Sequence, residues 1–190
     1  MKRVAVLASY NGSVIDAIVE AIKKEELAIE IVLIITNNSD ANVLQKAKKL
    51  SVDAKVINAK STQDPDTELF ETLKSYRVDL VLLAGYMKKL PSFVTENFCV
   101  INSHPSLLPK YGGKGMYGRF VHEAVVANAE KESGVTLHRV NEKYDDGEII
   151  LQKKLKLQED ETAKSLETKV KALEQQAVVE GLKKVIKTMD

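Results

Sequence analysis

The order of apolar and polar positions predicts alternating strands and helices over the first hundred residues. Short β-branched runs alternate with longer stretches whose apolar residues recur every three or four positions. Continuously apolar strands are buried on both faces, which is typical of βαβ units in a parallel sheet. The expected strands are residues 4–7, 29–36, 54–57, 78–83 and 99–102. Two of the expected helices span residues 13–24 and 65–76. Between them, Asp40 is expected to cap a third helix over Val43, Ala47 and Leu50.

The pattern changes after residue 105. Two prolines and four glycines predict a loop of about a dozen residues, and loops of that length in compact domains are usually functional or mobile. Beyond it we expect a helix at 119–128, strands at 134–141 and 148–157, and a long helix at 161–189. The sequence therefore predicts an α/β protein, a Rossmann-like three-layer αβα fold with a mostly parallel sheet of about seven strands, in a single domain over residues 1–190.

Composition and charge narrow the function classes. Hydrophobic residues make up 44% and charged residues 29% of the 190, and 28 basic against 27 acidic residues leave a net charge of +1. This balance gives no broad attraction for nucleic acid. The apolar runs are far shorter than the roughly 20 residues that span a bilayer. With no signal-peptide pattern and a lone Cys99, which we expect to be a buried structural thiol, the chain is expected to be cytoplasmic.

The turn Ser9-Tyr10-Asn11-Gly12-Ser13 lies between the first strand and the first helix. The N-terminus of a helix presents unpaired N–H groups that suit a phosphate, Gly12 lets a ligand approach the backbone, and Ser13 can cap the helix. Neither the dinucleotide fingerprint nor a P-loop is present. Alone, the turn is best interpreted as an ordinary strand–helix connection. Its position favours a ligand, because ligands of open α/β sheets gather at the carboxyl ends of strands.

The segment Asn102-Ser103-His104-Pro105-Ser106-Leu107-Leu108-Pro109-Lys110 is the strongest chemical signal. Asn102 and His104 are two residues apart at a strand end and therefore share one face. An amide donor and an imidazole aimed at one point suit a carbonyl that becomes an oxyanion. A hydrogen-bonded structural histidine is the alternative, but the polar partner and the Gly-rich loop favour catalysis.

This segment resembles the active-site signature of the folate-dependent formyltransferase family, and the resemblance extends over nearly the whole chain. The stretch Tyr144-Asp145-Asp146-Gly147-Glu148-Ile149-Ile150-Leu151-Gln152 is similar to the Asp-x-Gly loop of that family. Spacing alone leaves the choice between Asp145 and Asp146 open. The resemblance implies that Asp145 is the catalytic carboxylate and that Asp146 is a solvated turn residue.

The closest resemblance is to members that act on phosphoribosylglycinamide. It implies transfer of the formyl group of 10-formyltetrahydrofolate to the amine of 5'-phosphoribosylglycinamide in purine synthesis. Asn102 would donate to the oxyanion, and a protonated His104 would stabilise it and move a proton. Asp145 would raise the pKa of His104 and order a water. No metal is expected. His138 matches a position near the site and is rated secondary, and His122 is placed on the face of the helix after the loop.

The resemblance also implies two binding subsites. The phosphate would lie on the backbone amides of Gly12, Ser13 and Val14, where Val14 replaces the usual Asn. Lys171 would reach the phosphate and Glu174 the ribose, although without the resemblance the two would be a solvated intrahelical ion pair. Lys88 replaces the usual Arg and keeps the charge without the bidentate fork. The expected folate-binding residues are Met87, Lys88, Lys89, Leu90, Asn102, Asn141, Glu142, Lys143, Tyr144 and Asp145.

The resemblance divides the chain into three parts. Residues 1–100 would form the phosphoribosyl-binding half, 101–158 the catalytic and folate half, and 159–190 a C-terminal helix that packs back on the first half. The Gly-rich stretch 111–118 is interpreted as a mobile lid. The expected partners are the two small-molecule substrates, with no nucleic acid and no membrane, and the protein is expected to be a monomer or a homodimer.

Three alternatives compete with this interpretation. Methionyl-tRNA formyltransferases carry a similar Asn-x-His motif, but they have a different continuation and an additional basic domain. Formyltetrahydrofolate deformylases normally carry an N-terminal regulatory domain. A phosphosugar-binding module without chemistry would use the Gly12 turn, but it has no reason to combine Asn102, His104 and Asp145.

Overall fold

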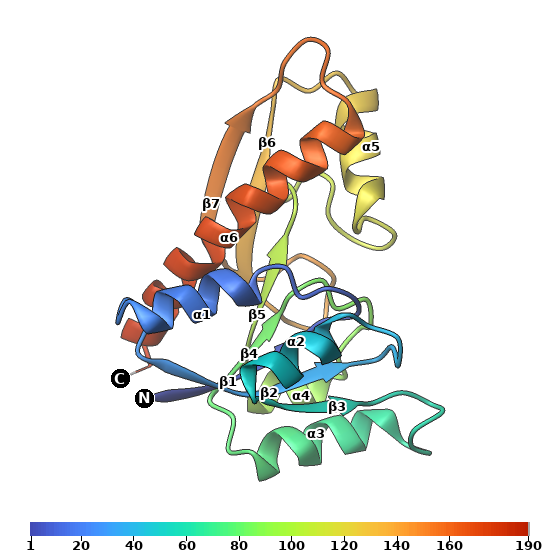
Figure 1. Ribbon diagram of the computed structural model, residues 1–190. Helices are drawn as coiled ribbons and strands as arrows, with labels where there is room; N and C mark the ends of the chain where they lie inside the picture. Colours follow the sequence, from blue (N-terminus) through green and yellow to red (C-terminus); the bar gives the residue numbers. More distant parts are fainter. Residues whose placement is uncertain (190) are drawn as a thin grey trace.

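The computed structural model describes residues 1–189 and contains a seven-stranded sheet in the order β3-β2-β1-β4-β5-β6-β7 (Figure 1). The first five strands run parallel, and β6 and β7 are antiparallel to their neighbours. This arrangement confirms the predicted mostly parallel α/β sheet. The strands are β1 Lys2–Leu7, β2 Ile29–Thr36, β3 Asp53–Val56, β4 Leu80–Leu83, β5 Cys99–His104, β6 Glu132–Arg139 and β7 Ile149–Lys156.

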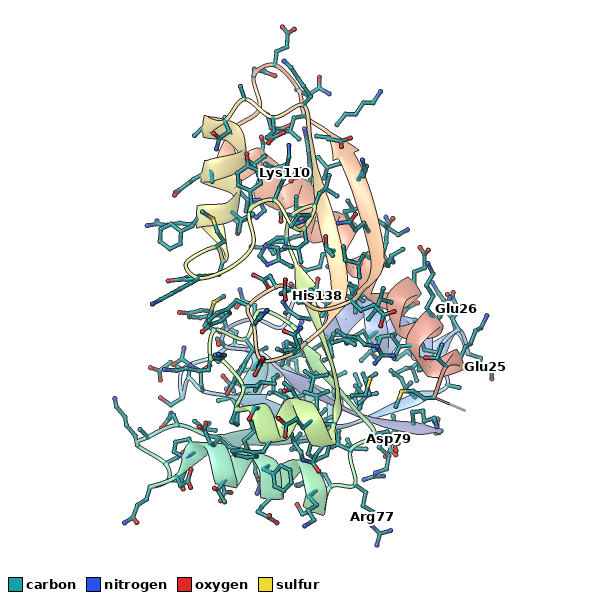
Figure 2. All side chains as sticks on the ribbon, turned by 180° about the vertical axis from the view of Figure 1, so that it is seen from behind. Glu25, Glu26, Arg77, Asp79, Lys110 and His138 are labelled. Atoms are coloured by element: carbon teal, nitrogen blue, oxygen red, sulfur yellow. The ribbon has the colours of Figure 1, made fainter. Side chains whose placement is uncertain are left out.

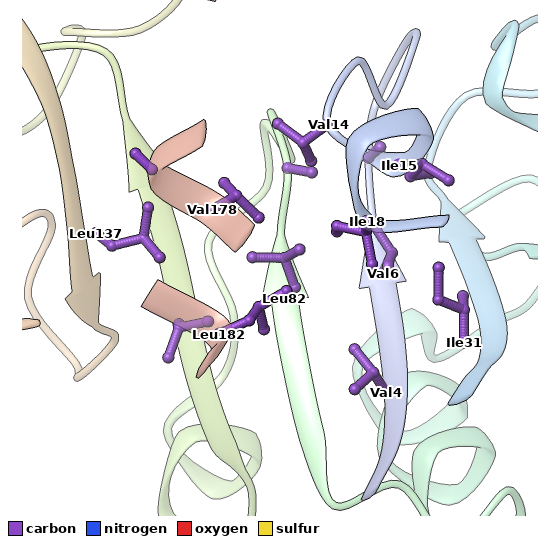
Figure 3. Packing of buried hydrophobic residues seen from close by; sticks show 14 of the residues in the cluster. Val4, Val6, Val14, Ile15, Ile18, Ile31, Leu82, Leu137, Val178 and Leu182 are labelled. Atoms are coloured by element: carbon purple, nitrogen blue, oxygen red, sulfur yellow. The ribbon is translucent and has the colours of Figure 1, made fainter. Parts of the chain in front are cut away.

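Six helices cover the two faces of the sheet. They are α1 Ile15–Lys23, α2 Val43–Leu50, α3 Pro65–Ser75, α4 Ser92–Asn97, α5 Arg119–Ala127 and α6 Ala163–Lys187. Val4 and Val6 of β1 pack in one core with α1, α2, α5 and α6, whereas Ala5 and Leu7 pack in a second core with α3 and α4. Figure 3 shows the first core. The alternation along β1 thus produces the three layers. Within residues 1–189, no helix is long and apolar enough to cross a membrane.

Several local expectations are wrong. Asp40 does not cap α2: the N-cap is Asn42, and the Asp40 N–H instead donates to Asn38 Oδ1 at 3.1 Å, which closes a turn before the helix. Ser13 does not cap α1 either, because the N-cap is Val14 and no side chain caps it. Cys99 is only half-buried, since it lies at the start of β5, where its Sγ accepts from Arg139 Nη1 at 3.1 Å. The short helix α4 is not predicted by the periodicity at all.

The long helix α6 packs against elements from early and from late in the chain. It contacts α1, α5, β6 and β7 (Figure 1). Lys183 Nζ lies 2.7 Å from Glu26 Oε2, and Gln175 Nε2 donates to the Ser13 carbonyl at 3.4 Å. The helix therefore connects the turn after β1 with the antiparallel strands.

Candidate active site

The carboxyl end of β5 forms the centre of the site together with the neighbouring strand β6. Their antiparallel register places His138 directly opposite Asn102. His138 Nδ1 lies 2.9 Å from the Arg139 carbonyl, which can only accept, so Nδ1 carries a hydrogen. His138 Nε2 lies 3.1 Å from Asn102 Nδ2. His138, rated secondary from the sequence, thus lies in the middle of the site and near the middle of the molecule (Figure 2).

Asp145 reaches this centre from the loop between β6 and β7. Its Oδ1 lies 3.6 Å from His104 Nδ1 and 3.5 Å from His138 Nε2. Its Oδ2 accepts from the Gly113 N–H at 2.9 Å. Asp146 is exposed and lies 3.8 Å from Lys143 Nζ. The structure therefore brings Asp145, and not Asp146, to the two imidazoles.

The backbone of this loop explains why Asp145 turns inward. The Arg139 N–H donates to the Glu148 carbonyl at 2.8 Å and closes the loop. At Gly147 a Cβ would lie only 1.8 Å from the Arg139 carbonyl oxygen, so only glycine fits there. Asp145 itself has a left-handed backbone with φ of 53°. Strain of this kind persists only where the surrounding structure imposes it, and it is common at functional sites.

Burial has the largest effect on the pKa of the central imidazole. The side chain of His104 is almost fully buried, and burial lowers the pKa of His104 below its ordinary value. Asp145 and the Tyr111 carbonyl raise this pKa without overcoming burial, and His138 lowers it further. Asp145 therefore acts on the pKa of His104 in the expected direction, while burial acts against it. Burial raises the pKa of Asp145, yet bonding to His138 and the charge of His104 outweigh burial and hold that pKa below its ordinary value.

The chain after His104 is fixed to β6 and β7 by buried polar side chains. Thr136 Oγ1 donates to the Ser106 carbonyl at 2.7 Å and accepts from the Leu108 N–H at 3.0 Å. Gln152 Nε2 donates to the Leu108 carbonyl at 2.8 Å. The Tyr111 carbonyl then accepts from His104 Nε2 at 2.7 Å. The Gly-rich stretch thus lies against His104 and Asp145, and its mobility stays a prediction.

The turn after β1 presents main-chain donors. The N–H groups of Gly12, Ser13 and Val14 donate to no acceptor in the part of the chain that the structure describes. The Val14 side chain is buried in the core (Figure 3), so this residue can offer a ligand only its backbone. Gly12 has φ of 53°, and a Cβ there would lie 2.7 Å from Ile15 Cδ1. The geometry suits an anion held by backbone N–H groups at a helix start.

Helix α2 holds this turn from the side. The Val43 N–H donates to the Tyr10 carbonyl at 2.9 Å, and Asn42 Nδ2 donates to Asn11 Oδ1 at 2.9 Å. Lys46 Nζ donates to the Gly12 carbonyl at 3.2 Å. These contacts with α2 hold the backbone of the turn in place. None of them uses the N–H groups of Gly12, Ser13 and Val14.

The two expected binding residues of α6 have different partners. Lys171 is exposed and pairs with Glu167 one turn earlier. Glu174 Oε1 accepts from Ser103 Oγ at 2.6 Å, next to the catalytic end of β5. Burial raises the pKa of Glu174, and the bond from Ser103 and the charge of Lys171 oppose that change. The intrahelical pair considered from the sequence therefore forms between Lys171 and Glu167 rather than between Lys171 and Glu174.

Two loops that we expect to bind folate lie against each other. Lys89 Nζ lies 5.5 Å from the centroid of the Tyr144 ring, a cation–π distance. The Met87 N–H donates to Ser9 Oγ at 2.7 Å, which ties the first loop to the end of β1. Leu90 is buried, and Asn102 and Asp145 are half-buried. The remaining members of the set are exposed: Met87, Lys88, Lys89, Asn141, Glu142, Lys143 and Tyr144.

Comparison with known proteins agrees with this geometry. The model of the formyl transferase family matches residues 2–182. The chain belongs to the formyl transferase family. The resemblance seen in the sequence is therefore confirmed.

Several relatives of this formyl transferase share a name. The phosphoribosylglycinamide formyltransferase of Haemophilus influenzae is 34% identical over 93% of this chain and 83% of its own length. The chloroplastic enzymes of that name from Vigna unguiculata and Arabidopsis thaliana are 38% and 35% identical over 94% of this chain. The chain spans only 59% and 63% of the length of these two plant relatives.

Solved structures of the family superpose closely. Glycinamide ribonucleotide transformylase 1 from Symbiobacterium toebii has a TM-score of 0.89 at 30% identity, with 96% of this chain and 86% of that chain covered. The phosphoribosylglycinamide formyltransferase from Coxiella burnetii has a TM-score of 0.86 at 36% identity, with 96% and 85% covered. The fold of this formyl transferase is thus that of the family.

Other residues near the site of this formyl transferase were given no role by the sequence. His122 of α5 is buried, and its Nδ1 has no hydrogen-bond partner within residues 1–189. Burial lowers the pKa of His122, and the charge of Glu167 opposes this change. Ser9 and Thr136 also hold site loops, and Ser103 donates to Glu174 of α6. Ser9 and Ser103 lie at or beside strand ends, whereas Thr136 lies inside β6, where no local signal marks it. Among the described residues, no group of three or more potential metal ligands lies together.

Proposed function

We propose that this formyl transferase moves the formyl group of 10-formyltetrahydrofolate to the amine of 5'-phosphoribosylglycinamide, a step of purine synthesis. The observation that carries the proposal is the convergence of Asn102, His104, His138 and Asp145 at the end of β5. Relatives named phosphoribosylglycinamide formyltransferase cover most of the chain and support the choice of substrate.

The phosphate of the ribonucleotide would lie on the free N–H groups of Gly12, Ser13 and Val14. Lys171 of α6 would turn from Glu167 toward this anion, and Glu174 would accept from the ribose hydroxyls. The folate would occupy the space beside Met87 and Leu90, with the 141–145 loop on its other side. This assignment is supported by the contact between Lys89 and Tyr144, which joins the two walls.

The reaction would proceed through a tetrahedral intermediate. The substrate amine attacks the formyl carbon, and the carbonyl π electrons move to oxygen, where Asn102 Nδ2 donates a hydrogen bond. His104 accepts a proton from the attacking nitrogen. It then gives this proton to the folate nitrogen as the bond between carbon and that nitrogen breaks. Formylated ribonucleotide and tetrahydrofolate are the products, and the imidazole returns to its starting state.

The lowered pKa of His104 suits this order of events. A neutral imidazole has a lone pair and can act as a base near neutral pH. Once it is protonated, the imidazolium lies beside the Asp145 carboxylate and the developing oxyanion, which both favour the positive charge. His104, with Asp145 beside it, therefore first accepts and then releases the proton.

One assay separates the candidate activities. Purified protein is mixed with 10-formyltetrahydrofolate, and tetrahydrofolate release is followed with and without phosphoribosylglycinamide. Release that requires the amine supports formyl transfer. Release without the amine would mean hydrolysis, and no release would mean a binding module; either result would overturn the proposal. In the active protein, His104→Ala should lower kcat at least about 100-fold.

We further propose that the protein acts in the cytoplasm as a monomer or a homodimer. Sedimentation equilibrium at enzyme concentrations used in the assay distinguishes these two states. A larger assembly would contradict this part of the proposal.

A further inference from the structure

Tyr111 has an unusual backbone next to the catalytic imidazole. Its φ of 55° lies in the left-handed region, which non-glycine residues rarely adopt. Its carbonyl accepts from His104 Nε2 at 2.7 Å. A strained residue persists only where its surroundings impose the conformation, so something must hold Tyr111 against His104.

The contact determines which ring nitrogen of His104 is available. A carbonyl can only accept, so Nε2 must carry a hydrogen. Nδ1 then faces Asp145 Oδ1 at 3.6 Å and is the nitrogen that can exchange a proton with the substrate. In the other tautomer, the Nε2 lone pair would oppose the lone pairs of the carbonyl. The Tyr111 carbonyl therefore selects the tautomer that catalysis needs.

The Tyr111 side chain is held by a carboxylate on the far side. Its hydroxyl donates to Glu130 Oε1 at 2.9 Å. Lys110 Nζ lies 3.0 Å from the same oxygen and fixes the carboxylate in turn. Glu130 lies between α5 and β6, and 22% of its side chain is exposed. In Figure 2, Lys110 lies above His138 in the view.

The Tyr111 ring packs against the edge of the first core, but part of it borders open space. A cavity of about 260 Å³ borders Tyr111, Leu108 and Glu130, and it is also lined by Ser133, whose Oγ has no partner within residues 1–189. The ring has space to move into once its hydroxyl is released. The bond to Glu130 therefore restrains the Tyr111 side chain and, through it, the Tyr111 carbonyl.

We propose that Glu130 is a positioning residue that acts through Tyr111 on His104. By holding the Tyr111 hydroxyl, it keeps the Tyr111 carbonyl on Nε2 and leaves Nδ1 as the nitrogen that transfers the proton. The inference rests on the proposed formyl transfer and adds to it a residue outside the substrate cleft. The other titratable groups near His104 are Asp145, His138 and His122 of α5. The substitutions of Glu130, Tyr111 and Glu132 described below leave all three unchanged.

Steady-state kinetics test the role. Glu130→Ala and Tyr111→Phe each remove one end of the bond, and each should lower kcat about 10-fold with both KM values within about 2-fold. Glu130→Gln keeps an acceptor oxygen and should retain kcat within about 3-fold. The double variant Glu130→Ala/Tyr111→Phe should be no slower than either single variant. The matched control is Glu132→Ala, which removes a carboxylate paired with Lys154 at 2.8 Å and should resemble the wild type.

Imidazole ¹⁵N spectra test the tautomer without any substrate. The chain has only three histidines, so His104→Ala assigns the signals. At pH 8, His104 of the wild type should carry its proton on Nε2, and both Glu130→Ala and Tyr111→Phe should show a mixture of tautomers. Unchanged spectra would overturn the proposal, as would equal losses of kcat in Glu130→Ala and Glu132→Ala. A changed spectrum in a protein without formyl transfer would support the positioning and remove only the proposed reaction.

Discussion

The ends of β1 and β5 carry the two halves of the site, and they are built in opposite ways. At the end of β5 the proposed chemistry resides in two side chains, the half-buried Asn102 and the buried His104, which meet His138 and Asp145. At the end of β1 the donors are backbone N–H groups, and the Val14 side chain is buried in the core.

The difference shows how each half depends on the rest of the fold. The β5 half needs the register of β6 and the tight loop at Gly147, because its functional atoms come from distant parts of the chain. The β1 half needs only a strand, a turn and a helix that starts at the right place. Side-chain substitutions should therefore abolish activity at β5, whereas at β1 only changes of the backbone should matter.

The largest expected effect separates two adjacent carboxylates of the β6–β7 loop. Asp145→Asn should lower kcat about 100-fold, because the charge beside His104 and His138 is lost. Asp146→Asn, whose parent side chain is exposed, should keep wild-type kinetics. Steady-state kinetics on both variants check this, and similar losses in the two would contradict the assigned geometry.

The next effect contrasts Gly12 with Val14 in the β1 turn. Gly12→Ala should lower the free energy of unfolding by about 1–3 kcal/mol, because its φ is positive and the new Cβ meets Ile15 and Val43. The displaced N–H groups should raise KM for the ribonucleotide about 10-fold.

Val14→Ala is the matched change. It removes buried methyl groups and should cost about 1–2.5 kcal/mol of stability, yet leave that KM unchanged because its N–H remains. Urea unfolding and substrate titration measure the two quantities. A KM that rose as much in Val14→Ala as in Gly12→Ala would refute a backbone-only subsite.

A smaller effect concerns the exposed lysine of α6. Lys171→Met should raise KM for the ribonucleotide about 3- to 5-fold at low salt, and less at high salt, where screening weakens the charge. Lys169→Met is the control, because Lys169 of the same helix pairs with Glu161, which lies just before the helix, at 2.6 Å. Salt-independent or equal effects of the two substitutions would exclude Lys171 from the phosphate subsite.

The smallest effect is a pH dependence of stability. Burial lowers the pKa of His104 and of His122, so the folded state binds fewer protons than the unfolded state below the ordinary value of 6.5. Stability should therefore fall as the pH decreases through 6.5 and continue to fall until the folded pKa values are passed. His122→Gln removes one of these groups, so urea unfolding should show a smaller fall between pH 8 and 5 than in the wild type. An identical fall would show that His122 keeps its ordinary pKa when folded.

The sequence by itself determined the alternation of strands and helices and the segment that carries Asn102 and His104. These features depend on apolar periodicity and on residues that are close in the chain, which the sequence displays directly. The choice of Asp145 over Asp146 needed the family resemblance, and the structure relates it to the close approach of Gly147 to Arg139.

Only the tertiary structure decided the central place of His138 and the contact of Tyr111 with His104. His138 lies 36 residues from Asn102 in the chain, and the register of two antiparallel strands sets their meeting. The lowered pKa of His104 also depends on burial by distant segments, which outweighs the nearby carboxylate. Periodicity is a local property of the chain, whereas strand register, burial and the electrostatic balance arise from contacts between residues far apart in it.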